Sequence, residues 1–318
     1  MQPLPFSIVI TNFNKARLID ACLRSALQQT VDRSQFEVVV VDDCSTDDSL
    51  QILSGYEPDI RVITNSVNRG ALGATLAGVD ASRGTYVVTL DGDDTIAENL
   101  LQTLVDSSLL RPDRFMRGRI DQSHDRPRKS TLIPAVGDPV CLTPAWHLAL
   151  EPKTGGSSLV FPRDAVADLC GRFPPIAVQD HAIPEMLSLV MNDYLRLSCY
   201  THFADTGDCV EHLSGNSAQL HHDKLLCGLA ILENATELKP VPTLITGLRR
   251  RLMGRCLRYV WKYQLWGSVP ACRKLLGSPS LEQLRSVAHR VAQEMRSRHA
   301  SIRYYASETP SNQHANAA

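Results

Sequence analysis

The chain has 318 residues, of which 43% are hydrophobic and 21% are charged, and its formal net charge is −1. This length is enough to bury a sizeable core, either in one large domain with an appendage or in two domains. The near-zero net charge argues against a nucleic-acid-binding protein, and the hydrophobic content argues against a disordered one.

The N-terminal sequence MQPLPFSIVI has no basic segment, and its apolar run is too short for a secretory signal. No stretch of the chain approaches the roughly 18 to 20 apolar residues of a membrane span. The nine cysteines include no C-x-x-C pair, which favours reduced cysteines inside a core over a disulfide framework or a zinc site. We therefore expect a cytoplasmic protein.

Apolar runs alternate with helical patterns through the first hundred residues, and this alternation predicts parallel βαβ units. The predicted strands have the short, β-branched character of strands buried on both faces. They cover residues 6–11, 36–41, 60–65 and 85–90. The predicted helices between them cover residues 17–30, 45–53 and 71–82, the last rich in small residues that allow close packing on a sheet.

Polar side chains follow three of these strands, where ligands of parallel sheets bind. Asn12 and Asn14 follow the first strand and Asp42 and Asp43 end the second, while the fourth runs into the acidic sequence DGDD at 91–94. Three carboxylates at the end of a buried strand are costly without a cation, and a D-x-D cluster can hold a divalent one together with substrate phosphates. The chain has neither G-x-G-x-x-G nor a P-loop, so we expect side chains at the strand ends to hold a nucleotide.

Four blocks in this order resemble family-2 glycosyltransferases of the GT-A fold: SIVITNFN, VVVVDDCSTDDS, NRGALGATLAGVDASRGTYVVTLDGDD and GGSSLVFPRDAVADLCGRFPPIAVQDH. The resemblance covers roughly residues 6 to 190. It implies an αβα sandwich with a mostly parallel central sheet and a Rossmann-like nucleotide-binding half, followed by a C-terminal helical extension. The implied divisions are a catalytic domain over 1–240 (nucleotide-binding half 1–98, acceptor half 99–240) and a basic helical extension over 241–318.

The resemblance further implies inverting transfer of a sugar from a nucleotide-diphosphate donor, with UDP expected, to an acceptor hydroxyl on a saccharide or lipid-linked saccharide. Cell-surface polysaccharide or lipopolysaccharide assembly is the expected setting. Two alternatives are a nucleotidyltransferase, which would normally have a Gly-rich loop after its first strand, and a non-catalytic sugar-nucleotide-binding or scaffold protein. The second alternative is raised by departures from the family pattern.

By this resemblance, the nucleotide-binding residues are Thr11, Phe13, Asn14, Asp42, Asp43, Arg69 and Asp91. Phe13 would stack on the base, the alternative being a core phenylalanine. One of the two aspartates at 42 and 43 would accept a hydrogen bond from the base, the alternative being a cap on the next helix. Thr11 offers a hydroxyl to the nucleotide, and Asp91 would serve the ribose or the water shell of a metal.

Arg69 could contact the diphosphate, because a guanidinium matches phosphate geometry, or could be a surface residue. An Arg-Asn pair common in the family is replaced here by Thr75 and Leu76. The resemblance assigns Mn²⁺ or Mg²⁺ as cofactor, with Asp93 as direct ligand and His212 completing the metal or diphosphate site. A surface histidine is the alternative for His212.

Two further roles come from the acids. Asp94 would orient its loop or cap a helix starting near residue 96. Replacing Asp93 by Asn could even stabilise the fold, because it removes the charge of one of three close carboxylates. Asp180 occupies the position of the general base, with Gln179 in place of the usual acidic neighbour. The alternative for Asp180 is an N-cap of the helix that follows it.

Residues 244–318 contain thirteen Lys or Arg and three Asp or Glu. Within 244–266, one helical stripe is apolar and a neighbouring stripe is basic. The apolar stripe comprises Ile245, Leu248, Leu252, Cys256, Tyr259, Tyr263 and Trp266, and the basic one Arg251, Arg255, Arg258 and Lys262. This pattern predicts a helix lying on an anionic membrane at the inner face of the plasma membrane, near a lipid-linked acceptor. The alternative is a helix packed on the catalytic domain with a solvated basic face.

Overall fold

The computed structural model of the chain describes residues 5–107, 109–121, 141–145, 159–169, 171–174, 179–204 and 217–303. Its strands are β1 (Phe6–Asn12), β2 (Phe36–Asp42), β3 (Arg61–Thr64), β4 (Tyr86–Asp91), β5 (Asp94–Ile96), β6 (Arg114–Asp121), β7 (Cys141–Pro144), β8 (Leu159–Pro162) and β9 (Asp193–Ala204). Its α-helices are α1 (Ile19–Leu27), α2 (Ser49–Ser54), α3 (Gly70–Ala81), α4 (Leu100–Asp106), α5 (Gln179–Val190), α6 (Ser217–Leu238), α7 (Pro242–Lys262), α8 (Val269–Cys272) and α9 (Leu281–Arg298). Short 3₁₀ turns include η3 (Arg163–Leu169), η5 (Trp266–Ser268) and η6 (Arg273–Leu275).

The strands form one mixed sheet in the order β3-β2-β1-β4-β8-β6-β9-β5, with β7 paired to β9. The first four strands are parallel, which confirms the predicted βαβ units. Strand β8 runs antiparallel to both β4 and β6, and β9 is parallel to β6. The predicted sandwich with a mostly parallel central sheet is therefore confirmed, and its parallel half covers the residues predicted to bind the nucleotide.

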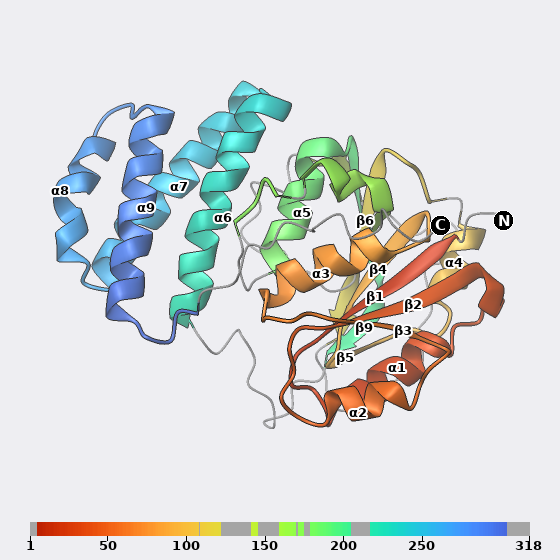
Figure 1. Ribbon diagram of the computed structural model, residues 1–318. Helices are drawn as coiled ribbons and strands as arrows, with labels where there is room; N and C mark the ends of the chain where they lie inside the picture. The colour runs from red at the N-terminus through yellow and green to blue at the C-terminus, as the bar shows by residue number, and fades with distance from the viewer. Residues whose placement is uncertain are drawn as a thin grey trace, which may run out of the picture.

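Helices cover both faces of the sheet, as Figure 1 shows. Successive side chains of a strand point to opposite faces, so neighbours along β1 enter different cores. Val9 packs in the cluster that contains residues of α3 and α5, whereas Ile8 and Ile10 pack with α1 and α4. Helix α3 lies close to the sheet because a Cβ on Gly78 would be 2.4 Å from the Val9 side chain. The prediction of a closely packed small-residue helix is confirmed.

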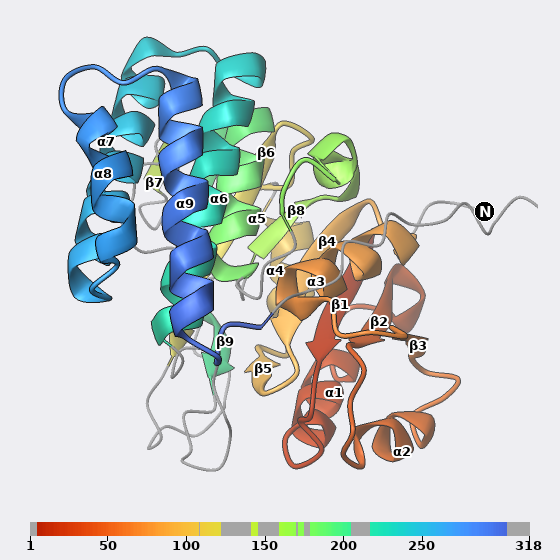
Figure 2. The ribbon, with the colours of Figure 1, turned by 60° about the vertical axis from the view of Figure 1, so that its left-hand side comes forward.

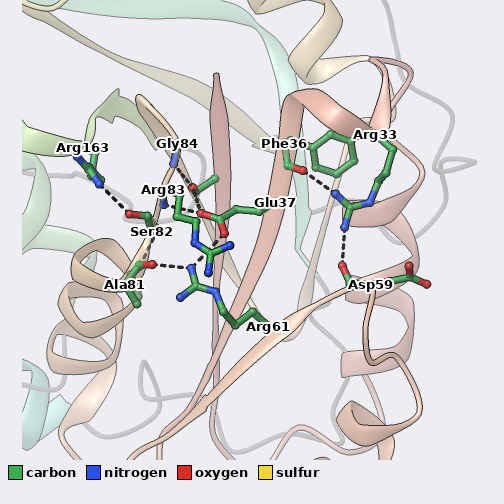
Figure 3. Close-up of polar contacts among 12 residues, drawn as sticks. Arg33, Phe36, Glu37, Asp59, Arg61, Ala81, Ser82, Arg83, Gly84 and Arg163 are labelled. Carbon is green, nitrogen blue, oxygen red and sulfur yellow. Dashed lines mark hydrogen bonds and ion pairs between the residues drawn. The ribbon is translucent and has the colours of Figure 1, made fainter. Parts of the chain in front are cut away.

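A polar network ties together the starts of the four parallel strands (Figure 3). The Glu37 carboxylate on β2 accepts hydrogen bonds from the Ser7 hydroxyl (2.7 Å) and the Arg83 backbone N–H (2.5 Å) and pairs with Arg61 (3.1 Å). Ser7 Oγ in turn accepts from the Gly84 N–H at 2.8 Å. This end of the sheet is thus closed by bonds within the protein, and the opposite end, where the strands finish, carries the candidate site.

Helices α6 to α9 form a helical unit beside the sheet, visible in Figures 1 and 2. Helix α6 packs against α5 on one side and against α7 and α9 on the other. Leu229, Leu252 and Val291 belong to the same hydrophobic cluster as residues of α3 and α5, so the core is continuous from the sheet into this unit. The predicted boundary at 240/241 coincides with the turn between α6 and α7, two helices that pack together.

Helix α7 buries the apolar stripe that the sequence suggested for membrane contact. Leu248, Leu252, Cys256 and Tyr259 are at most 5% exposed. From the basic stripe, Arg255 is buried as well, and its guanidinium donates to the Lys224 carbonyl on α6 (2.5 Å). The expectation that the apolar stripe lies on lipid is therefore wrong for its buried residues, because α6 and α9 already cover them, whereas Trp266 lies beyond the end of α7 and is 51% exposed. Among the described residues, no helix has the length and apolarity needed to cross a membrane.

Candidate functional site

Loops after β1, β2 and β4 are fastened to one another by backbone hydrogen bonds that continue the sheet past its last residues. The Asp43 N–H donates to the Asn12 carbonyl (2.8 Å), and the Gly92 N–H donates to the Thr11 carbonyl (2.9 Å). A Cβ at Gly92 would lie 2.9 Å from that same Thr11 oxygen, so only glycine permits this approach. The predicted convergence of three polar segments on one rim is therefore present.

Asp42 is fully buried and shapes this rim from within. Its Oδ1 accepts from Asn12 Nδ2 (2.7 Å), and its Oδ2 accepts from the Ser45 N–H (3.0 Å). It does not cap the following helix: α2 begins at Ser49, whose N–H donates instead to Asp47 (3.0 Å). Asp42 therefore holds the loop after β2 in place, and its nucleotide contact remains a prediction.

Asp43 anchors the loop that leads into α3. Its Oδ1 accepts from the side-chain amide of Asn65 and from the Arg69 N–H, both at 2.8 Å. Burial raises the pKa of the Asp43 carboxyl above its ordinary value, and these hydrogen bonds oppose the shift. The backbone of Arg69 is thereby fixed next to Asp43, which brings two of the predicted nucleotide-binding residues together.

Phe13 and Asn14 occupy the loop between β1 and α1. Asn14 has a positive φ of 54°, and its N–H donates to Ser45 Oγ (2.9 Å) while its Oδ1 accepts from the Thr46 N–H (2.8 Å). These bonds give Asn14 a loop-fixing function. Phe13 is partly exposed and belongs to neither hydrophobic cluster, so the core alternative does not describe it. Its stacking on a base remains a prediction.

The acidic cluster is paired with a cation from the protein itself. Lys15 Nζ lies 2.5 Å from Asp93 Oδ2, and the two side chains are only 16% and 14% exposed. Asp91 accepts from the Thr11 hydroxyl (3.3 Å), which joins two more predicted residues. Sequence analysis missed Lys15, although a lysine in the loop beside the first strand, across from D-G-D-D, offered the signal. Burial raises the pKa of the Cys22 thiol well above its usual range, and the negative charges of the acidic cluster raise it further.

Of the two roles predicted for Asp94, the structure excludes the helix cap, and the orientation of its loop remains a prediction. It begins β5, which pairs antiparallel with β9, and it is 7% exposed. Helix α4 starts only at Leu100, with Asn99 at its N-cap, so Asp94 does not cap that helix. The cap was wrongly expected because the sequence between the acidic cluster and the helix forms a short strand, and that strand depends on a partner more than a hundred residues away.

Part of the ligand set predicted for the metal lies in the described part of the chain. Asp91 and Asp93 offer carboxylate oxygens, which suit Mg²⁺ or Mn²⁺, and a cation already sits against Asp93 in the form of the Lys15 ammonium. Within the ranges given above, no group of three or more His, Cys, Asp or Glu side chains is arranged to hold a metal ion. These cations often take their remaining ligands from water and substrate phosphates, so the donor chemistry fits. His212 lies outside the described residues, and the metal remains a prediction.

The predicted base, Asp180, lies in the first turn of α5, which begins at Gln179. It is therefore inside the helix and not at the N-cap position of the alternative interpretation; its side chain lies outside the described atoms. Further along α5, buried Glu185 pairs with Arg251 of α7 (3.4 Å) and accepts from the Cys227 thiol of α6 (3.2 Å). The helix that carries Asp180 is thereby fixed to the helical unit, a connection the sequence did not reveal.

Comparison with known proteins agrees with this arrangement. The sequence profile of Glycosyl transferase family 2 matches residues 7–125. The chain is 37% identical over 102 residues to poly(ribitol-phosphate) beta-glucosyltransferase of Bacillus spizizenii, a match covering 31% of this chain and 16% of that protein. It is 37% identical over 101 residues to the succinoglycan biosynthesis protein ExoO of Rhizobium meliloti, covering 31% of this chain and 28% of that protein. These matches span less than a third of either relative.

The fold extends the similarity to nearly the whole chain. The crystal structure of S. aureus TarS 1–349 in complex with UDP-GlcNAc superposes with a TM-score of 0.63 at 18% identity, covering 94% of this chain and 93% of that one. At this identity the likeness concerns the fold, and it confirms the predicted GT-A architecture with its C-terminal helices.

Proposed function

We propose that this chain is an inverting glycosyltransferase, on the premise that residues 7–125 match the model of glycosyl transferase family 2. It moves a sugar from a nucleotide-diphosphate donor, UDP-linked, to a hydroxyl of a saccharide or lipid-linked saccharide. The relatives named for poly(ribitol-phosphate) glucosylation and succinoglycan biosynthesis support cell-surface polysaccharide or lipopolysaccharide assembly as its setting. The observation that carries the proposal is the rim where backbone hydrogen bonds fasten the Asp43 and Gly92 loops to the end of β1 and where Lys15 pairs with Asp93.

The rim supplies the contacts that a nucleotide diphosphate requires. The Phe13 ring would stack on the base, and an oxygen of Asp43 would accept a base N–H, as uracil offers. Asp91 would accept from the ribose, while Arg69 and Lys15 would place positive charge near the phosphates. Thr75 takes no part, because it is buried and its hydroxyl donates to the Ala71 carbonyl at 2.9 Å.

In the transfer step, the Asp180 carboxylate takes the proton of the acceptor hydroxyl. The acceptor oxygen then attacks the anomeric carbon on the face opposite the leaving group, so that the new glycosidic bond forms as the bond to the nucleoside diphosphate breaks. The nucleoside diphosphate leaves with the bonding electron pair. Mg²⁺ or Mn²⁺, held by Asp93 with His212, would neutralise phosphate charge when bound.

A donor screen with the full chain tests the proposal. Nucleotide sugars with different bases and sugars are incubated with Mn²⁺, and released nucleotide is measured. We expect release from UDP-linked donors and about tenfold or greater weakening of UDP binding in Phe13→Ala, as for lost base stacking. Tyr86→Phe, a substitution at an aromatic residue of β4 far from the rim, is the matched control.

Two observations favour a second function, a non-catalytic sugar-nucleotide-binding protein. Gln179 replaces the acid that usually precedes the base, and Thr75, which replaces a polar residue of the family's Arg-Asn pair, is buried. The same screen separates the two functions. The binding protein would be favoured if calorimetry shows that a UDP-sugar binds but no nucleotide is released over a day, whichever saccharide acceptor is added. The proposal places the chain in the cytoplasm, at the inner face of the plasma membrane.

A further inference from the structure

A basic segment without acidic residues forms the outer part of the helical unit. Between residues 238 and 281 the sequence has nine Lys or Arg and no Asp or Glu. The segment covers α7, α8 and the turns around them, and Figures 1 and 2 show α8 on the side of the helical unit away from β1 to β3. Such a charge distribution gives this side a positive potential in a chain whose net charge is −1.

The face of α7 that turns away from α6 and α9 is both basic and apolar. Leu257 is 48% exposed and Trp261 76% exposed, next to the exposed side chains of Arg258 and Lys262. Trp266, 51% exposed, packs edge-on against Trp261 with ring centroids 5.9 Å apart. We call these five residues the basic-aromatic face.

The two cations of this face have no carboxylate partner in the described part of the chain, although Lys262 Nζ lies over the Tyr263 ring, 5.5 Å from its centroid. Arg251 of the same helix, by contrast, is turned inward to Glu185. Two adjoining tryptophans exposed to water forgo the free energy of burial, so a covering partner is indicated. Indole rings with neighbouring Lys and Arg are the combination found where proteins enter the headgroup region of a bilayer.

The shape of the face also suits a flat partner. Arg250 is exposed on the same side of α7, so the exposed residues from Arg250 to Lys262 extend over about 18 Å of the helix. Trp266 continues this row beyond the end of the helix. We propose that the basic-aromatic face binds the surface of an anionic lipid bilayer, with Trp261 and Trp266 entering the headgroup region and Arg258 and Lys262 next to lipid phosphates. The contact uses Arg258 and Lys262 of the predicted basic stripe and Trp266 from the end of the apolar one, but its apolar residues on α7 are Leu257 and Trp261, on the side opposite to the buried Leu248, Leu252 and Cys256.

This contact does not depend on the proposed catalytic function, and its test needs no substrate. The full chain is sedimented with vesicles of phosphatidylcholine alone or of equal parts phosphatidylcholine and phosphatidylglycerol. We expect binding to the anionic vesicles only, decreasing as salt is raised. Arg258→Gln/Lys262→Gln should weaken the partition coefficient about thirtyfold, at about 1 kcal/mol per charge, and Trp261→Ser/Trp266→Ser should abolish binding.

Matched variants from the catalytic part control for charge and apolar surface. Arg83→Gln/Arg111→Gln removes the same charge from exposed residues, and Leu50→Ser/Val105→Ser removes exposed apolar side chains. Both should bind as the unchanged protein does. In a Trp146→Phe background, the emission of Trp261 and Trp266 should shift to the blue on binding, which reports their transfer from water.

Several results would overturn the inference. These are equal binding to neutral and anionic vesicles, no binding at low salt, or binding that both face variants retain. A dimer in solution that Trp261→Ser/Trp266→Ser dissociates would assign the face to a second copy of the chain. If the chain binds an acidic protein but not the vesicles, the basic-aromatic face would be assigned to a protein partner.

Discussion

Replacement of Asp93 by Asn should destabilise the protein, although the sequence alone suggested the opposite sign. Three neighbouring carboxylates predict a gain when one is neutralised, but the structure pairs Asp93 with Lys15 at 2.5 Å, with side chains 14% and 16% exposed. Neutralising Asp93 leaves the ammonium largely buried without its partner. Exposed pairs contribute about 0.2 to 1 kcal/mol, and breaking a fully buried one costs about 3 to 5 kcal/mol. At this exposure we expect a loss of about 2 kcal/mol.

The assay is urea unfolding of the full chain in chelator, so that no metal ion interacts with the acids. Lys15→Met should also destabilise, and the double variant Lys15→Met/Asp93→Asn should be about 1 to 3 kcal/mol more stable than the sum of the two losses predicts. Asp113→Asn is the control, because Asp113 pairs with Arg111 at an exposed site and should change stability by less than about 0.5 kcal/mol. A more stable Asp93→Asn, or single losses that simply add, would refute the pairing argument.

Three other outcomes are expected. Gly254→Ala should stabilise the protein by about 0.5 to 1 kcal/mol, because the new Cβ would meet only a distant guanidinium. Gly78→Ala should destabilise it by about 1 to 3 kcal/mol, because the new Cβ would overlap with Val9. Urea unfolding measures both changes, and equal effects would contradict the packing argument. Burial lowers the pKa of His202 to about 4 in the folded protein, so its imidazole binds a proton more readily in the unfolded chain. The folding free energy is therefore retained above pH 6.5, and about 2 kcal/mol of it is lost between pH 7 and pH 5. His202→Gln should flatten that profile, and an unchanged slope would assign the loss to other groups. Asp180→Asn should keep UDP affinity and lose about 10²-fold or more in turnover; parallel losses in both would indicate a structural function.

Local patterns predicted the parallel half of the fold well. The four predicted strands match β1 to β4 within a residue or two, because an apolar run followed by a polar break limits where a buried strand can end. The polar residues at those ends came together for the same reason: parallel strands finish at one edge of the sheet. Their partners within the site were not predictable, since Asn14, Asp42 and Asp43 each bond to loops that another strand positions.

The sequence by itself determined the periodicity of α7 and the position of the acidic cluster, since both depend on neighbours along the chain. Only the tertiary structure decided which side of α7 is covered and which cation meets Asp93. Lys15 and Asp93 are 78 positions apart and meet because β1 and β4 are adjacent and parallel. Helix α7 turns its apolar stripe to α6 and α9, and this leaves Trp261 outside. A helical pattern marks an apolar stripe, but the surface area that neighbouring helices can bury decides whether that stripe packs inside the protein.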